Sequence, residues 1–265
     1  MRAWGMRILF IGDIVGKPGR AFVKAQVQLL REELELDFVV ANGENAAAGS
    51  GLTGKIAGEI LDSAVDGITL GDHVWDQRGF VDEIGTLASV CRPANLPPEN
   101  PGRTHLIIER KGMKLGVFTV LGRTFMKTNA DCPFRCADAK IAELDGQCDA
   151  ILAEIHAETT SEKVAMGWYL DGRAQMVVGT HTHIPTGDAT ILTRGTAYHT
   201  DAGMTGPYES ILGREIQPIV LRFLDGLPRV WPVATNDVRI CGTLVDIDVE
   251  LGIATKCEQF TLRAR

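Results

Sequence analysis

Acidic and histidine side chains that could bind a metal ion follow five short apolar runs of the sequence. Each run has the length of a buried strand. Because the carboxyl ends of strands in an open α/β sheet form the crevice that holds ligands, we expect these side chains on one rim. The residues concerned are Asp13, Glu44, Asn45, Asp72, His73, His156, His181 and His183.

Carboxylates and imidazoles crowded at one rim favour a bound cation, because unpaired polar and charged groups are costly to bring together. A mixture of carboxylate oxygens and imidazole nitrogens suits manganese, iron or zinc better than calcium. His181 and His183 are two residues apart, so in an extended segment each side chain can serve a different ion. A carboxylate that bridges two ions holds them about 3.5–4 Å apart, as in two-metal hydrolases.

Each of these residues also has an ordinary structural explanation. An acid directly after a strand, such as Asp13, Glu44 or Asp72, is more often a turn or helix-capping residue. A single histidine at a strand end, such as His156, is more often a hydrogen-bonded core residue. The combination on successive strand ends is what favours a metal site.

Other catalytic and structural motifs fit the sequence less well. Segment 12–18 lacks the glycine spacing of a phosphate-binding P-loop and the Ser or Thr that would follow Lys17. Cys132 and Cys136 have no second cysteine pair at zinc-site spacing, and no Gly-x-Ser-x-Gly nucleophile elbow occurs. The remaining histidines, His105 and His199, lack neighbouring ligand residues and are left out of the predicted site.

Strand and helix patterns alternate along the first part of the chain, which predicts a sheet with parallel neighbours. Thr53 is the expected N-cap of the second helix. Residues 16–19 contain two glycines and a proline and are expected to break the chain before the first helix. The expected strands span 7–12, 38–41 and 67–71, and the expected helices span 20–35 and 53–65.

After residue 90 the pattern changes to a hairpin, further strands and fewer helices. Lys111 and Gly112 separate two apolar runs, which predicts the hairpin. Thr159 and Glu162 have the spacing of a capping box that opens a helix running to about Leu170. A further helix is expected at 136–146, and strands are expected at 106–109, 115–120, 150–155, 175–179, 217–224, 238–248 and 252–262. We expect one α/β domain over residues 1–265.

Composition and charge exclude several classes of protein. The chain has 265 residues, 45% hydrophobic and 23% charged, which is typical of a globular protein and excludes a disordered or collagen-like chain. With 27 basic and 34 acidic residues the net charge is −7, which argues against duplex nucleic acid as a partner. No apolar run approaches the about 18 residues of a membrane span, and residues 1–7 do not resemble a signal peptide. The six scattered cysteines predict reduced thiols and a cytoplasmic location.

Several of the 29 glycines adjoin the predicted ligands. Glycine allows the backbone to turn sharply and to approach a ligand closely where a side chain would obstruct it. These positions are Gly12, Gly16, Gly43, Gly71 and Gly179.

The order of these motifs resembles a known family. Gly-Asp, a glycine-acid block, Gly-Asp-His, an isolated histidine and Gly-x-His-x-His together are similar to the signature of calcineurin-like metallophosphoesterases. More closely, the chain resembles the YmdB-like subfamily of bacterial metallophosphoesterases. The matching segments are 7–20, 41–47, 92–95, 131–134, 156–163, 167–173, 179–183 and 200–207. The resemblance implies an α/β fold in four αββα layers: a two-sheet β-sandwich flanked by helices.

The resemblance also implies roles for the site residues. Asp13, Glu44, Asn45 and His183 would bind one metal ion. Glu44, Asp72, His156 and His181 would bind the other, so Glu44 would bridge the two. His73 would be the catalytic histidine beside the leaving group. The ions would be iron or manganese, with magnesium and zinc as alternatives.

The family implies a phosphodiesterase that acts on 2′,3′-cyclic nucleotides. We therefore expect a small phosphodiester or cyclic nucleotide as substrate, hydrolysed by attack of a metal-bridging hydroxide. The same ligands would also suit a phosphomonoesterase or a nuclease, and a non-catalytic RNA- or protein-binding regulator could retain them. No membrane partner is expected, and a homo-oligomer is compatible with the sequence.

Two positions depart from the family pattern. Asp72 stands where the family usually has asparagine, and its added negative charge should tighten metal binding and slightly reduce Lewis acidity. Val15 stands where the wider superfamily has a histidine two residues after the first aspartate.

Overall fold

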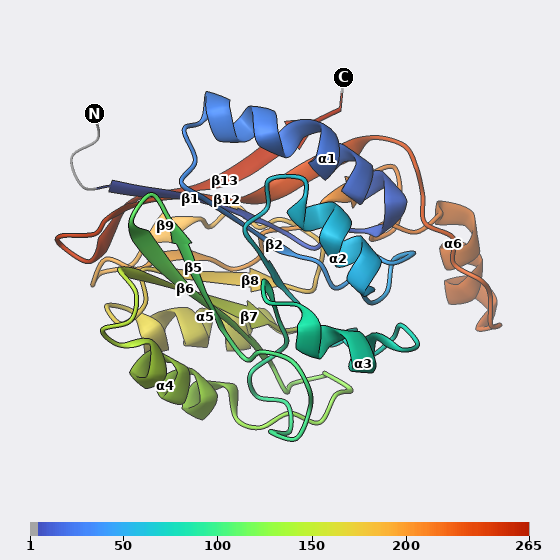
Figure 1. Ribbon diagram of the computed structural model, residues 1–265. Coiled ribbons are helices and arrows are strands. Elements are labelled where there is room, and N and C mark those ends of the chain that lie inside the picture. Colours follow the sequence, from blue (N-terminus) through green and yellow to red (C-terminus); the bar gives the residue numbers. More distant parts are fainter. Residues whose placement is uncertain (1–4, 265) are drawn as a thin grey trace.

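Two β-sheets pack face to face in the computed structural model, which describes residues 5–264 (Figure 1). Within those residues the first sheet has seven strands in the order β11-β12-β1-β2-β3-β4, with β13 paired to β12. Its strands are β1 (Gly5–Ile11), β2 (Phe38–Asn42), β3 (Gly67–Thr69), β4 (Val90–Cys91), β11 (Gly206–Pro207), β12 (Val238–Asp248) and β13 (Ile253–Arg263).

The second sheet has six strands in the described residues, in the order β5-β6-β7-β8-β10-β9. They are β5 (Leu106–Arg110), β6 (Met113–Leu121), β7 (Ala150–His156), β8 (Met176–Thr180), β9 (Thr190–Ile191) and β10 (Ala197–His199). The helices are α1 (Gly16–Glu33), α2 (Gly54–Leu61), α3 (Phe80–Glu83), followed by a 3-10 turn (Ile84–Thr86), α4 (Pro133–Leu144), α5 (Thr160–Leu170) and α6 (Ile216–Asp225).

Helices cover the outer face of each sheet, which gives the predicted αββα order of layers (Figure 1). Helices α1 and α2 lie on the first sheet, and α4 and α5 lie on the second. Successive residues of β1 illustrate the burial: Phe10 packs in the core between the sheets, whereas Ile11 packs in the core under α1. Strands buried on both faces explain the continuous apolar runs of the sequence.

The strand pairing confirms the predicted parallel core and the predicted hairpin. Strands β1, β2 and β3 are parallel neighbours, so their carboxyl ends meet at one edge. Strands β7 and β8 are parallel as well and end at the same level as β6. The hairpin of β5 and β6 turns at Lys111 and Gly112. Thr53 caps α2, because its side chain accepts a hydrogen bond from the backbone nitrogen of Ile56 (3.3 Å).

Three local predictions are wrong. Residues 16–19 form the first turn of α1 instead of a break. A proline is tolerated there because the amide N–H groups of the first turn have no partner within the helix, so the missing one is not needed. The expected strand at 217–224 is helix α6, whose apolar residues recur at helical spacing. Thr159 makes no capping bond with its side chain, and Glu162 instead accepts hydrogen bonds from the backbone nitrogens of Arg123 and Thr124.

Helix α6 stands away from the two sheets, and its side chains Phe223 and Leu224 are 83% and 77% exposed (Figure 1). No helix within residues 5–264 is long and apolar enough to cross a membrane. The expectation about a signal peptide at residues 1–7 falls partly on residues 1–4, which lie outside the described residues. The assignment of one domain stays a prediction.

Candidate metal centre

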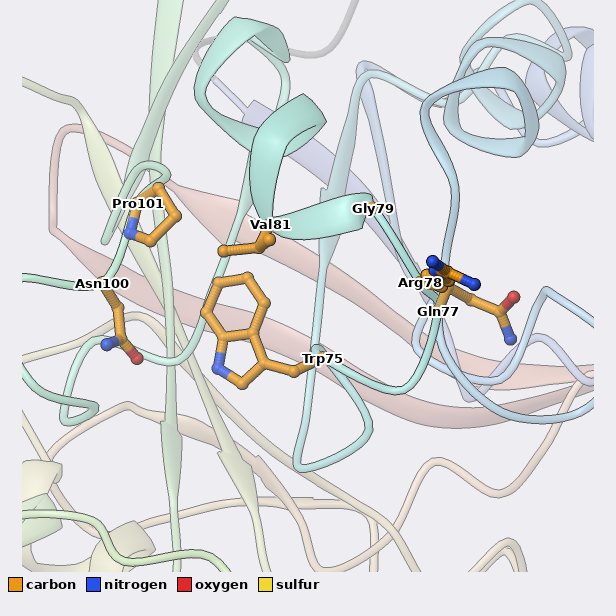
Figure 2. Close-up of a pocket in the computed structure, with 7 residues that line it drawn as sticks. All are labelled: Trp75, Gln77, Arg78, Gly79, Val81, Asn100 and Pro101. Atoms are coloured by element: carbon orange, nitrogen blue, oxygen red, sulfur yellow. The ribbon is translucent and has the colours of Figure 1, made fainter.

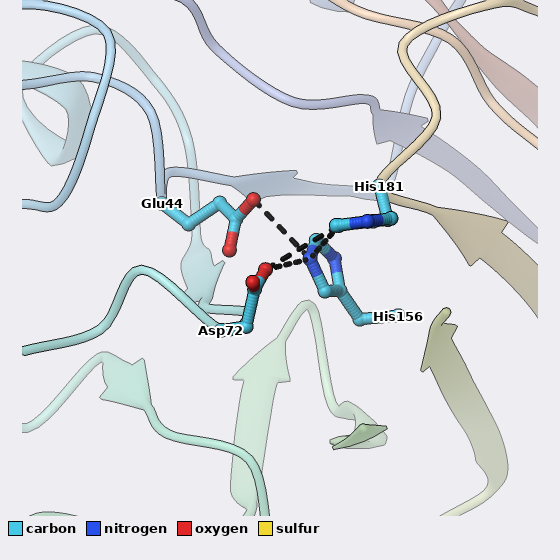
Figure 3. A group of neighbouring side chains, drawn as sticks. All are labelled: Glu44, Asp72, His156 and His181. Carbon is cyan, nitrogen blue, oxygen red and sulfur yellow. Dashed lines mark hydrogen bonds and ion pairs between the residues drawn. The ribbon is translucent and has the colours of Figure 1, made fainter. Parts of the chain in front are cut away.

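Four predicted ligands converge at the edge where the strands of both sheets end (Figure 3). Glu44 follows β2, Asp72 follows β3, His156 ends β7 and His181 follows β8. One ligand atom from each residue lies within 4.8 Å of the others. We call Glu44, Asp72, His156 and His181 the four-residue cluster.

The distances within the four-residue cluster are those of direct contacts. His156 Nε2 lies 3.0 Å from Asp72 Oδ1 and 3.2 Å from Glu44 Oε1. His181 Nδ1 lies 3.3 Å from the same Asp72 oxygen and 3.1 Å from His156 Nε2. Two ring nitrogens and two carboxylates therefore face one small volume, which is the arrangement expected around a cation.

Gly71 allows this close approach. A Cβ atom at this position would overlap the carboxylate of Glu44 and the ring of His156. The residue before Asp72 therefore has to be glycine for the strand ends to meet.

Charge and burial act against each other in the four-residue cluster. Burial alone would raise the pKa of Glu44, but the neighbouring His156 charge lowers it below the usual value. Burial would likewise raise the pKa of Asp72, but hydrogen bonds to His156 and His181 lower it. Burial would lower the pKa of His156, whereas the charge of Glu44 raises it well above the usual value. The histidine rings and carboxylates of the cluster are thus held together by shared protons in the absence of metal. A bound cation would take the place of these protons.

The other predicted ligands, Asp13, Asn45 and His183, lie next to the four-residue cluster, and we call them the second ligand set. Asp13 is fully buried, and its Oδ2 accepts a hydrogen bond from the backbone nitrogen of His181 (3.2 Å). Its Oδ1 is buried with no hydrogen-bond partner. Burial raises the pKa of this carboxyl above its usual value. A buried oxygen without a partner is the observation here that best fits a cation.

Asn45 and His183 contact each other, and His183 is also close enough to act electrostatically on Asp13. Asn45 Nδ2 lies 3.1 Å from His183 Nε2 and donates to Glu44 Oε1 (3.0 Å). His183 Nδ1 lies 3.2 Å from the carbonyl oxygen of Leu212. Within the part of the chain that the structure describes, the carboxylate of Asp13 and the ring of His183 lie outside the four-residue cluster.

The backbone at His181 and His183 differs from the predicted extended segment. Both residues have positive φ angles, 95° and 65°, in the left-handed region that non-glycine residues seldom adopt. Between them, Thr182 donates to Asp201 through its backbone nitrogen (3.2 Å) and its hydroxyl (2.7 Å). The same carboxylate pairs with the fully buried Lys163 (2.6 Å). A buried ion pair therefore holds this turn, and the two rings still reach different partners.

His73 stands beside the four-residue cluster and outside it. Its backbone nitrogen lies 3.4 Å from Glu44 Oε2, and its half-exposed ring has Nδ1 2.7 Å from Asp76 Oδ2. Burial would lower the pKa of His73, but the charges of Glu44, Asp72 and Asp76 raise it.

A pocket of about 310 Å³ lies beside the segment that follows His73. The close-up of this pocket shows the indole of Trp75 lying next to Val81 and Asn100 (Figure 2). Gln77, which also lines the pocket, donates to the carbonyl oxygen of Ser50 (2.6 Å). Ser50 in turn has its hydroxyl 3.3 Å from His73 Nδ1, so the pocket wall and the histidine are connected.

The sequence did not identify several polar residues that lie next to the site. Asn42 contacts the backbone nitrogen of Glu44, Thr180 contacts the ring of His156, and Glu154 contacts both Asn42 and Thr180. A charged residue inside the apolar run 150–155 was the available signal, since Glu154 is two residues before His156 and shares its face of the strand. His199, which was left out, lies elsewhere in the core between Thr243 and Thr186. The six cysteines are free, as expected.

The chain is similar to known proteins over nearly its whole length. A family model described as "YmdB-like protein" matches residues 9–260. A Bacillus subtilis protein named 2′,3′-cyclic-nucleotide 2′-phosphodiesterase is 46% identical over 257 residues, which cover 97% of each chain.

Two crystal structures have closely similar folds. One is of a hypothetical protein from Thermus thermophilus, with a TM-score of 0.91, 40% identity, and coverage of 98% of this chain and 100% of that chain. The other is described as a novel phosphatase from Mycoplasma pneumoniae, with a TM-score of 0.91, 30% identity, and coverage of 98% of this chain and 94% of that chain.

Proposed function

Because the chain belongs to the YmdB-like protein family, which makes it a metallophosphoesterase-type enzyme, we propose that it hydrolyses small phosphodiesters at a two-metal centre. The observation that carries this proposal is the convergence of two carboxylates and two imidazoles in the four-residue cluster. The name of the Bacillus subtilis relative supports 2′,3′-cyclic nucleotides as the substrates.

The chain offers ligands for two ions. The four-residue cluster would hold one ion, and the second ligand set together with Glu44 would hold the other. The buried, unpartnered Oδ1 of Asp13 supports the second position. A half-turn of the Asn45 amide would direct its oxygen to an ion in place of the nitrogen that now faces Glu44 and His183. Iron or manganese suits this mixed donor set.

When bound, two such cations would lower the pKa of a water molecule and withdraw charge from the phosphoryl oxygens. The side chains of this protein supply the remaining steps. Asp76 accepts a hydrogen bond from Nδ1 of His73, and the raised pKa of this ring favours its doubly protonated form, in which Nε2 donates a proton to the leaving oxygen. General acid catalysis of this kind contributes about 10²- to 10⁴-fold.

The pocket lined by Trp75 and Asn100, which is linked to His73 through Gln77 and Ser50, supports a substrate that carries a nucleobase. Trp75 offers an aromatic surface on which a base could stack, and Asn100 offers an amide for its polar edge. Stacking of a base on an aromatic side chain is worth about 1–3 kcal/mol. A Trp75→Ala variant is therefore expected to raise KM for a cyclic nucleotide and to leave KM for bis-p-nitrophenyl phosphate nearly unchanged.

The function is tested by metal analysis of the purified protein together with turnover of three substrates. These are a 2′,3′-cyclic nucleotide, bis-p-nitrophenyl phosphate and p-nitrophenyl phosphate. We expect bound metal and faster turnover of the two diesters than of the monoester. Preference for the monoester would favour a phosphomonoesterase, and protein with neither metal nor turnover would favour a non-catalytic regulator.

A further inference from the structure

Glu154 is a fully buried acid that neither ligand set contains. It lies on β7, where residues alternate between the two faces, and its side chain faces the core between the sheets directly below the four-residue cluster. Its Oε1 lies 2.6 Å from Asn42 Nδ2 and 2.6 Å from Thr180 Oγ1, while its Oε2 is buried without a partner. Burial of a carboxyl group with one oxygen unpartnered lowers the stability of the fold, so we expect this side chain to have a role in the site.

The hydrogen bonds at Thr180 run in one direction. Glu154 Oε1 carries no proton whether the carboxyl is ionised or is protonated on Oε2, so it can only accept hydrogen bonds. The Thr180 hydroxyl therefore donates to Glu154. The Thr180 oxygen lies 2.8 Å from His156 Nδ1 and must therefore accept from it. The neutral ring then carries its proton on Nδ1, and its lone pair on Nε2 faces Glu44 and Asp72.

A second arm leads from Glu154 to another ligand. Asn42 donates to Glu154 through Nδ2, and its Oδ1 accepts from the backbone nitrogen of Glu44 (3.0 Å). Asn42 ends β2 of the first sheet, whereas Glu154 and Thr180 lie on β7 and β8 of the second. One buried carboxyl thus ties together ligands carried by the two sheets.

We propose that Glu154 and Thr180 are positioning residues, in which Glu154 anchors Thr180 and Thr180 holds the Nδ1 proton of His156, so that Nε2 is presented to a metal ion. The proposal rests on the metal centre proposed above. A metal-binding histidine commonly donates its other N–H to such a partner, and loss of that partner costs about 10- to 100-fold in metal affinity or activity.

The test compares variants of the full-length protein in a Mn²⁺ titration of the metal-free form. Thr180→Val removes the hydroxyl and keeps the shape, and we expect it to lose about 10- to 100-fold in Mn²⁺ affinity. Thr180→Ser restores the hydroxyl and should restore the affinity. Glu154→Met removes the anchor at similar volume and should behave as Thr180→Val does, with Glu154→Gln losing less.

Thr119 provides the matched control. It is a fully buried threonine on β6, directly opposite Glu154 in the strand pairing, and its hydroxyl has no hydrogen-bond partner. Thr119→Val makes the same chemical change in the same layer without touching His156. We expect its Mn²⁺ affinity to equal that of the unmodified protein. An equal loss in Thr119→Val and Thr180→Val would mean that the core is merely perturbed and would overturn the proposal.

A spectroscopic readout tests the proton itself. In the Zn²⁺-loaded protein, the ¹H–¹⁵N spectrum should contain a protected Nδ1–H signal of His156, assigned by its absence in His156→Gln. The signal should be lost or shifted in Thr180→Val and present in Thr180→Ser. Its persistence in Thr180→Val, or unchanged Mn²⁺ affinity in that variant, overturns the proposal. Neither readout uses turnover, so a protein that shows the Thr180 effects but hydrolyses no phosphodiester would reject only the proposed function.

Discussion

The two ligand sets differ in how far they are assembled by the protein alone. The four-residue cluster has its donor atoms within 4.8 Å of one another, on residues that end or closely follow buried strands. In the second ligand set, Asn45 and His183 bond to each other and His183 also approaches the carbonyl oxygen of Leu212. The first set therefore has all its donors in one compact group, whereas the second depends on a histidine that lies further along the turn after β8.

This difference comes from what carries each residue. Strand register fixes where β2, β3, β7 and β8 end, and buried partners such as Thr180 hold the side chains there. His181 directly follows β8, whereas His183 lies two residues further along the same turn, where its ring contacts the carbonyl oxygen of Leu212. A site whose donors lie closer to the ends of strands loses less conformational entropy on binding. We therefore expect one tight and one weaker metal site.

Removal of the residue shared by both sets should have the largest effect. Glu44 touches His156 in the cluster and Asn45 in the second set, so Glu44→Ala should lose both ions. The loss of activity should exceed the about 100-fold that removal of an outer partner costs. Metal content after dialysis and diester turnover measure this. Retention of one tightly bound ion would show that Glu44 does not bridge the sets.

A methyl group at Gly71 should come next. The added Cβ would overlap Glu44 and His156, so Gly71→Ala should separate the donors of the four-residue cluster and abolish its tight metal binding. Gly58→Ala is the control, because Gly58 lies in helix α2 with open space around its Cβ position. That control should gain about 0.5–1 kcal/mol in unfolding free energy. Tight metal binding in Gly71→Ala would contradict the assembled geometry.

His73 belongs to neither set and provides a way to separate chemistry from metal binding. His73→Ala should keep both ions and lose about 10²- to 10⁴-fold in kcat, since it removes only the proton donor. Metal analysis and kcat on the same preparation give the answer. A metal-replete variant with full activity would contradict the role assigned to this histidine.

Asp72→Asn should have the smallest effect. An amide oxygen can still reach the ion, but the cluster loses a negative charge that lies 3.0 Å from His156 Nε2 and 3.3 Å from His181 Nδ1. We expect weaker Mn²⁺ binding and, at saturating Mn²⁺, a modest rise in kcat as Lewis acidity increases. Tighter Mn²⁺ binding by this variant would contradict the electrostatic explanation.

The sequence predicted that these side chains would lie near one another, because neighbouring strands of a parallel sheet end at one edge whatever the loops do. That they bind metal stays a prediction. That rule accounts for Glu44 and Asp72, which follow neighbouring strands of one sheet, whereas the approach of Asp72 to His156 also requires the edges of the two sheets to meet. The turn at His181 and His183 could not be predicted, because its positive φ angles depend on the distant Asp201 and Lys163.

Elsewhere, short-range patterns were ambiguous. The short apolar run at 217–224 was interpreted as a strand, although its apolar residues recur at the spacing of helix α6. Glu162 had the spacing of a capping box, but a loop about 40 residues earlier in the chain offered its carboxylate better donors. The roles of the individual ligands stay predictions.

The most direct test of the two-metal account is an equilibrium titration of the metal-free protein with Mn²⁺, followed by diester turnover at each step. The account predicts two ions per chain that bind in separate steps. His181→Ala should remove the tighter step, and His183→Ala should remove only the weaker one. Turnover should appear as the second ion binds. A single ion that supports full turnover, or loss of the tighter step in His183→Ala, would contradict it.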